Sequence, residues 1–289
     1  MAENMQDVKR RIKSVTSMEH ITNAMKLVSA AKMRRAKATF DRTNEQFRLI
    51  TESIQKVFSK AKSVPEKYAE SDEIKKTCYI VMTSNKGLCA GFNTNIIKEA
   101  ETLIEKADSK AVILAVGSKG RDYFQKRGFD IISEYAKAPE TITFQETQDL
   151  VAPLLRSYEE GDIDEIVLVY TTFVSTMQQD VKSKRMLPFD MDLQNDSEQE
   201  EDMEDEIEYE PSVEAVFNYL VKKYFEMMFF GAVIESATCE HAARRMAMEN
   251  ATDNAREMLG DLELFYNRAR QAAITNQLIE IVSGSEALK

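Results

Sequence analysis

The sequence predicts an α/β fold in which a Rossmann-like α/β domain is inserted between two long terminal helices that form an antiparallel coiled coil. All five prolines lie between residues 65 and 211, so both ends of the chain lack the strongest helix breaker. Near both ends, apolar residues recur every three or four positions, which is the period of a helix. The middle of the chain alternates short apolar runs with helical stretches, which is typical of a parallel sheet.

Residues 1–64 are expected to form the first helix, because they contain no glycine and carry one apolar stripe. The stripe consists of Val8, Ile12, Val15, Met18, Ile21, Met25 and Val28. The segment is basic, with eleven Lys or Arg against five acids in residues 1–48. It lacks interleaved aromatic residues and belongs to an acidic chain. A solvated surface, or one that faces acidic groups, is therefore favoured over a nucleic acid interface.

Residues 65–210 are expected to form the α/β domain. Strands are predicted at 77–83, 111–116, 129–135 and 165–172, and helices after Gly91, from Ser118 and over 143–160. Two more segments, 180–187 and 206–209, alternate apolar and polar residues and predict an antiparallel edge. They flank an acidic run, since residues 189–210 hold twelve acids and no base. We expect a solvated acidic loop near 190–208.

Residues 211–289 are expected to form the second long helix. From Pro211, which suits a helix start, glycine occurs only at positions 231, 260 and 284. A seam with a spacing close to that of a coiled coil comprises Ala243, Ala247, Ala251, Asn254, Met258, Leu262, Phe265, Ala269 and Ala272. Such a stripe must pair with another helix. Because the α/β domain returns the chain near its starting point, pairing with residues 1–64 is favoured over a homodimer.

Composition excludes several classes of protein. The longest apolar run, residues 227–234, has eight residues, whereas a membrane span needs roughly 20. The three cysteines lack CxxC spacing, which indicates buried reduced thiols. Two histidines, His20 and His241, are too few for a His-rich metal site or most Ser-His-Asp arrangements, and each is expected on a helix surface or seam. We expect no metal, no cofactor and no catalytic residue.

Nucleotide binding by the α/β domain is also disfavoured. No Gly-Lys dipeptide occurs, which excludes the usual P-loop. Gly87, Gly91, Gly117 and Gly120 follow strands, yet none forms GxGxxG. A tight strand-to-helix turn needs glycine with or without a ligand, so a structural role is favoured over phosphate binding.

Three blocks of sequence carry a resemblance to a known family. Residues 21–35 read ITNAMKLVSAAKMRR, and residues 84–93 read SNKGLCAGFN. The third block runs from MAMENA at 246–251 through YNRARQ at 266–271 to ITNQLIEIVSG at 274–284. Together they resemble the γ subunit of F-type ATP synthases of the bacterial type. The order helix, α/β domain and long helix agrees with that family.

The resemblance implies that the chain is the central rotor shaft of a proton-translocating synthase, although the sequence does not distinguish H⁺ from Na⁺ as the coupling ion. The paired helices would pierce a ring of three α and three β subunits, and their rotation would couple ion flow to catalysis in β. Expected partners are the α and β subunits, the ε subunit and the membrane c-ring, with no nucleic acid and no membrane insertion. The implied location is the cytoplasmic face of the bacterial cell membrane, as a peripheral subunit needed for assembly and regulation.

The resemblance also implies contact residues. Those expected to touch β, as bearing and catch, are Met25, Lys32, Arg34, Arg35, Arg270, Gln271, Thr275 and Gln277. A turn where the α/β domain meets the coil is assigned to Lys86, Gly87, Leu88, Gly91 and Asn93. Two alternatives stay open: Met25 is equally well placed in the seam, and the C-terminal group could be an ordinary polar helix face.

The sequence departs from the family pattern at several positions. The family usually has Asp at Asn85, Gly at Ala90, Lys at Asn23, Glu at Gln277 and Ala at Ser285. Two rival functions remain: a Rossmann-type enzyme with helical extensions, which would bind nucleotide, and a coiled-coil scaffold, which would form a parallel homodimer.

Overall fold

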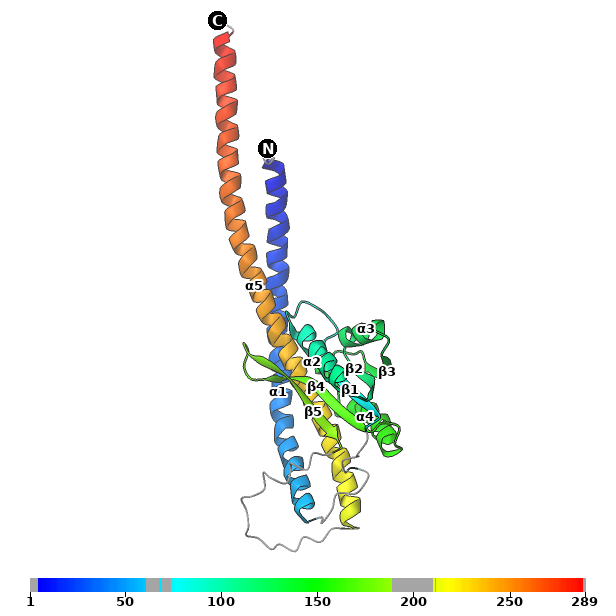
Figure 1. Cartoon of the computed structure of the whole chain (residues 1–289). Helices are drawn as coiled ribbons and strands as arrows, with labels where there is room; N and C mark the ends of the chain where they lie inside the picture. Colours follow the sequence, from blue (N-terminus) through cyan, green and yellow to red (C-terminus); the bar gives the residue numbers. More distant parts are fainter. Residues whose placement is uncertain (1–4, 61–67, 69–73, 189–209, 211, 288–289) are drawn as a thin grey trace. The chain divides into compact units, whose positions relative to one another are not determined.

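A computed structural model describes residues 5–60, 68, 74–188, 210 and 212–287. Figure 1 labels α1 (Met5–Lys60), β1 (Lys76–Met82), α2 (Phe92–Lys106), β2 (Lys110–Val116), α3 (Ser118–Lys126), β3 (Asp130–Tyr135), α4 (Phe144–Glu159), β4 (Glu165–Phe173), β5 (Gln179–Leu187) and α5 (Val213–Ala287). A short 3-10 helix, η2 (Pro139–Thr141), lies between β3 and α4. The chain divides into two compact units. Ala30–Ala243 form the α/β unit, and Met1–Ser29 with Arg244–Lys289 form the two-helix unit.

The α/β unit contains one sheet of five strands in the order β3-β2-β1-β4-β5. The first four strands in the chain run parallel, and β5 pairs antiparallel with β4. The parallel sheet and the antiparallel edge at 180–187 are therefore confirmed. The other expected edge segment, 206–209, and the acidic run apart from Glu210 lie outside the described residues.

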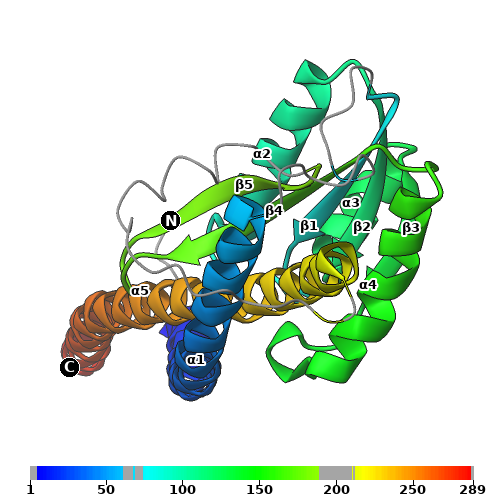
Figure 2. The same cartoon turned by 90° about the horizontal axis from the view of Figure 1, so that it is seen from below.

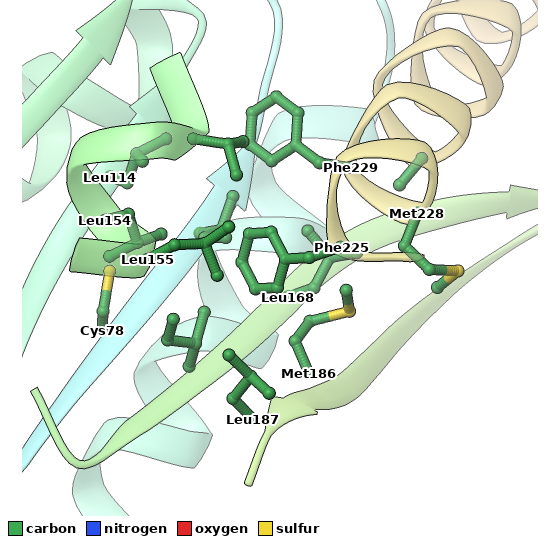
Figure 3. Packing of buried hydrophobic residues seen from close by; sticks show 14 of the residues in the cluster. Cys78, Leu114, Leu154, Leu155, Leu168, Met186, Leu187, Phe225, Met228 and Phe229 are labelled. Atoms are coloured by element: carbon green, nitrogen blue, oxygen red, sulfur yellow. The ribbon is translucent and has the colours of Figure 1, made fainter. Parts of the chain in front are cut away.

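Both faces of the sheet are buried at its central strands β1, β2 and β4, which explains why these three strands are almost continuously apolar. Because side chains alternate along a strand, Cys78 and Ile80 of β1 join a cluster with α4 and α5, whereas Tyr79 and Val81 join a cluster with α2 and α3. Figure 2 shows α2 and α5 on opposite sides of the sheet. Figure 3 shows Leu168 of the sheet packed with residues of α4 and α5, including Phe225.

The sequence explains two helices of the α/β unit, α4 by its capping residues and α5 by its apolar surface. Thr143 and Glu146 form a capping box at the start of α4, in which Glu146 N donates to Thr143 Oγ1 at 3.2 Å and Thr143 N donates to Glu146 Oε2 at 2.9 Å. The part of α5 from Phe217 to Ala243 is buried on most sides, as expected for a core helix. No helix among the described residues is long and apolar enough to span a bilayer.

The two-helix unit pairs α1 with α5 in opposite directions. Thr252 Oγ1 donates to Thr22 Oγ1 at 2.8 Å. On either side of this pair, Arg256 Nη2 lies 3.0 Å from Glu19 Oε1, and Lys26 Nζ lies 3.8 Å from Glu249 Oε1. Residue numbers rise along one helix as they fall along the other, so the intramolecular antiparallel pair is confirmed.

The residues predicted to form the seam of this pair are partly wrong. On α1, Val8 is buried as predicted, but Met18, Ile21 and Val28 are 57%, 60% and 57% exposed. Two polar residues, Thr22 and Ser29, take interior positions. Burying Thr22 costs little because it bonds with Thr252 across the pair. Apolar periodicity selects the apolar stripe as the buried face of the helix, and it cannot show that polar residues beside that stripe are buried instead.

On α5 Ala243 is buried as predicted, but between residues 247 and 255 the seam is displaced by one residue from the predicted one. The buried positions are Met248, Thr252 and Ala255, whereas Met258 and Phe265 are 53% and 42% exposed. Small and apolar residues on α5 are spaced by threes and fours along two neighbouring stripes, so spacing alone does not show which stripe faces α1. The bond between Thr252 and Thr22 shows that the stripe containing Thr252 does.

The cysteine expectation is confirmed, whereas the histidine expectation is confirmed only for His20. Cys78, Cys89 and Cys239 are all free and buried, as predicted for reduced thiols. His20 is exposed on α1, whereas His241 of α5 is buried in the α/β unit.

Candidate interaction sites

The turn between β1 and α2 is closed by its own side chains. Asn93, in the first turn of α2, accepts from Ser84 N at 2.9 Å and donates through Nδ2 to Ser84 Oγ at 2.7 Å. Ser84 Oγ lies 2.7 Å from the carbonyl oxygen of Lys86, to which it donates. These bonds give the turn a fixed geometry. Cys89 and Phe92 of the turn share an apolar cluster with Cys239 of α5.

Two residues of this turn have left-handed backbones. Leu88 has φ 62° and Ala90 has φ 49°, a region that is unfavourable for residues with a Cβ. The Leu88 side chain is 64% exposed. The turn therefore presents an exposed apolar side chain on a strained backbone. The left-handed backbone at Ala90 is a physical reason why the family usually has glycine at this position.

Asn85 uses both ends of its amide. Its Nδ2 donates to the carbonyl oxygens of Ala136 and Lys137 at 2.9 and 2.8 Å, and its Oδ1 accepts from Ser118 N at 2.9 Å. Asn85 thereby ties the turn after β1 both to the start of α3 and to the segment after β3. An aspartate could not make the two donor bonds.

The glycines at the start of α3 have a packing role. Gly117 has φ +91°, and a Cβ there would lie 2.1 Å from the carbonyl oxygen of Thr83. Gly120 N donates to Thr83 Oγ1 at 2.8 Å, and a Cβ on Gly120 would come within 2.9 Å of the same oxygen. Both glycines allow α3 to approach the end of β1 closely, which supports the structural role over phosphate binding.

The place where α/β sheets usually bind ligands is filled by α5. Ligands of such sheets bind outside the carboxyl ends of the strands, where the strand order reverses. Here Ser236 Oγ of α5 donates to the carbonyl oxygen of Met82, the last residue of β1, at 3.5 Å. The space lined by these residues together with Thr83, Val116 and Glu240 leaves no room for a water-sized molecule. This packing argues against the rival enzyme reading.

One of the predicted bearing residues makes an ion pair within the chain. Lys32 Nζ lies 2.6 Å from Glu140 Oε1, which belongs to η2. His241 Nε2 of α5 lies 3.5 Å from the same oxygen. The contact with His241, followed by that with Lys32, lowers the pKa of Glu140 to about 2 against the opposing effect of burial. The sequence did not predict the contacts of Glu140 with Lys32 and His241, because Glu140 is 108 positions from Lys32 and belongs to no recognisable pattern.

The other predicted contact residues lie at the surface. Arg34 and Arg35 are exposed on α1, and Met25 is half-buried. The C-terminal residues Arg270, Gln271, Thr275 and Gln277 are all exposed on α5. Beyond them, four large apolar side chains are also exposed, which sequence reasoning did not single out: Leu278, Ile279, Ile281 and Val282. Exposed apolar surface of this kind marks an interaction site.

Comparison with known proteins identifies the family. The ATP synthase family model matches residues 4–288. The ATP synthase gamma chain of Alkaliphilus metalliredigens is 42% identical over 290 residues, covering 100% of both chains. The chain belongs to the ATP synthase gamma chain family. Another member, from Acetobacterium woodii, is named a sodium ion specific gamma chain and is 39% identical over the full length of both chains.

Solved structures agree with this family. The central stalk and c-ring structure of the Tetrahymena thermophila mitochondrial ATP synthase contains a chain with 26% identity and a TM-score of 0.58, covering 80% of this chain and 99% of that one. A chain of the Euglena gracilis mitochondrial enzyme matches with a TM-score of 0.67 and 19% identity, over 98% of this chain and 94% of that one, and supports the fold alone. As a gamma chain, this protein is a non-catalytic stalk subunit and a peripheral component of its synthase.

Proposed function

We propose that this gamma chain is the rotor shaft of a bacterial synthase, turning inside a ring of α and β subunits so that ion flow drives or follows catalysis in β. The observation that carries the proposal is the exposed apolar stripe of Met18, Ile21 and Val28 on α1. At this level Thr22 and Thr252 occupy the interior of the helix pair, so this stripe is free to face a surrounding sleeve. Apolar contacts have no fixed direction, which suits sliding.

The proposed bearing and catch use the exposed residues of both helices. Met25, Lys32, Arg34 and Arg35 would face β from α1, with the two arginines exposed and Lys32 about half exposed. Arg270, Gln271, Thr275 and Gln277 would form the catch, supported by their exposure on α5. Exposed ion pairs with a partner would contribute about 0 to 1 kcal/mol each, weak enough to exchange during rotation.

The α/β unit would connect the shaft to the other rotor parts. We assign it contacts with the ε subunit and the c-ring at the cytoplasmic face of the cell membrane; the Tetrahymena thermophila structure, which contains a central stalk with a c-ring, supports the c-ring contact. The turn with Lys86, Gly87, Leu88, Gly91 and Asn93 is proposed to contact β through its exposed leucine. We keep 1–64, 65–210 and 211–289 as the proposed domain limits.

Co-expression with α and β subunits of the same source tests the proposal. We expect a purified complex of three α, three β and one copy of this chain, with ATPase activity that depends on its presence. Mass determination and an ATPase assay would measure both properties. A chain that fails to co-purify and forms a stable dimer alone would instead favour the scaffold reading.

A further inference from the structure

The α/β unit contains a cavity of about 400 Å³ between α1, the β4–β5 hairpin and α5. Its size lies within the range of small-molecule sites. Strand β1 pairs with β4 only as far as Val169, so residues 170–173 pair with β5 alone and extend beyond the rest of the sheet. The extension forms one wall, α1 contributes Phe40, and α5 contributes Met227 and Met228.

The cavity has an apolar body and a basic rim. Tyr170 and Phe173 of β4 line it together with the two methionines. On β5, Lys182 and Lys184 point to the same face, since they are two positions apart, and Lys182 lies directly opposite Tyr170. Both lysines are exposed, so they mark the side on which the cavity meets solvent.

A glycine inside α5 leaves this space open. Gly231 lines the cavity, and a Cβ built on it would meet no atom within 4 Å. Glycine inside a helix is less favourable than alanine, and no neighbouring atom requires it here. Gly231 therefore makes the helix less stable than alanine would, at a position where a side chain would reduce the volume of the cavity.

The carboxylate that lines the cavity, that of Glu235, already accepts a hydrogen bond from the backbone. Glu235 Oε1 accepts from Phe173 N at 2.9 Å. Burial raises the pKa of Glu235, while the bond from Phe173 and the charge of Lys182 oppose that rise. The negative charge of Glu235 compensates the positive charge of Lys182, so the net positive charge of the rim is that of Lys184. The Nζ atom of Lys184 lies 5.7 Å from the centre of the Tyr224 ring.

We propose that this cavity binds an amphiphilic monocarboxylate, with its acyl chain among Phe40, Met227 and Met228 and its carboxylate at Lys184. The apolar walls match the chain, and the basic rim matches the head group. This inference does not depend on the rotor function, because it concerns the α/β unit alone.

Isothermal titration of the full-length chain with three ligands of one chain length tests the chemical class. We expect decanoate to bind about fivefold more tightly than decanol, as one exposed ion pair would provide, and decyltrimethylammonium to bind most weakly. Tighter binding of the cation would overturn the proposal, because Glu235 rather than Lys184 would then recognise the head group. Absence of decanoate binding would overturn it as well.

Three variants locate the site. Gly231→Leu should abolish decanoate binding, whereas Gly260→Leu, at a second open position of the same helix, should leave it unchanged. Lys184→Gln should remove the preference for decanoate over decanol. Gly231→Ala should weaken binding while raising the melting temperature by about 2 to 4 °C, which separates loss of the cavity from loss of folding. Binding that survives Gly231→Leu would place decanoate elsewhere and refute the assignment.

Discussion

The Nζ atom of Lys32 on α1 lies 2.6 Å from Oε1 of Glu140, and His241 of α5 lies 3.5 Å from the same oxygen. One carboxylate of the α/β unit thus contacts both long helices within that unit. Glu140 is 13% exposed at its side chain, so water screens these contacts less than it screens a surface pair. For a rotor, such a contact helps to keep the sheet fixed to its two helices while torque passes between them.

Removal of this carboxylate should destabilise the chain in a pH-dependent manner. The folded pKa of Glu140 is lowered from 4.5 to about 2. Its contribution is therefore fully present above pH 4.5 and is lost as the pH falls towards 2. We expect Glu140→Gln to lower the free energy of unfolding by about 1 kcal/mol at neutral pH, and by less as the pH falls. Urea unfolding of both proteins between pH 7 and 3 measures the difference.

A matched control separates this pair from ordinary surface charge. Glu134 also forms an ion pair, with Arg121 at 3.2 Å, but its side chain is 47% exposed. Glu134→Gln should change stability by less than Glu140→Gln does at neutral pH. An equal loss in both variants, or a loss at Glu140 that does not vary with pH, would contradict the structural account.

Asn85→Asp should destabilise the α/β unit even though the family usually has aspartate there. The change removes the donors to the carbonyl oxygens of Ala136 and Lys137 and sets a negative charge beside them. We expect a loss of about 1 to 3 kcal/mol in the free energy of unfolding. Asn95→Asp, the same change at an exposed position in the first turn of α2, should be neutral or slightly stabilising. Similar effects at both positions would show that the Asn85 amide is not the cause.

Ala90→Gly should stabilise the chain. The left-handed backbone at this residue, with φ 49°, is strained for alanine and relaxed for glycine. Part of the gain is offset by the greater freedom of glycine in the unfolded chain, which leaves about 0.5 to 1 kcal/mol. Thermal unfolding of the two proteins measures the shift. Ala100→Gly in the interior of α2 should have the opposite sign, and destabilisation at both sites would argue against strain at Ala90.

Local patterns predicted the elements well because each strand or helix is a continuous stretch with its own period. The strand at β2, for example, is apolar on both faces, and α4 carries its own capping residues. The seam failed because Thr22 and Thr252 are 230 positions apart, and nothing near either residue signals that it is buried. The Glu140 contacts were missed for the same reason. Pairing between distant polar residues depends on how the elements pack, which a local period does not encode.

The proposed catch can be tested apart from the shaft. Arg270→Glu combined with Gln271→Ala changes two exposed side chains of α5 and leaves the helix backbone bonds in place. In the assembled synthase we expect slower ATP hydrolysis and weaker coupling to ion flow, with assembly retained. Arg268→Glu makes the same charge reversal two positions earlier, on a different helix face, and should have a smaller effect. Equal rates and coupling in the double variant and the unchanged synthase would refute the catch, whereas the exposed stripe of α1 would still support the shaft.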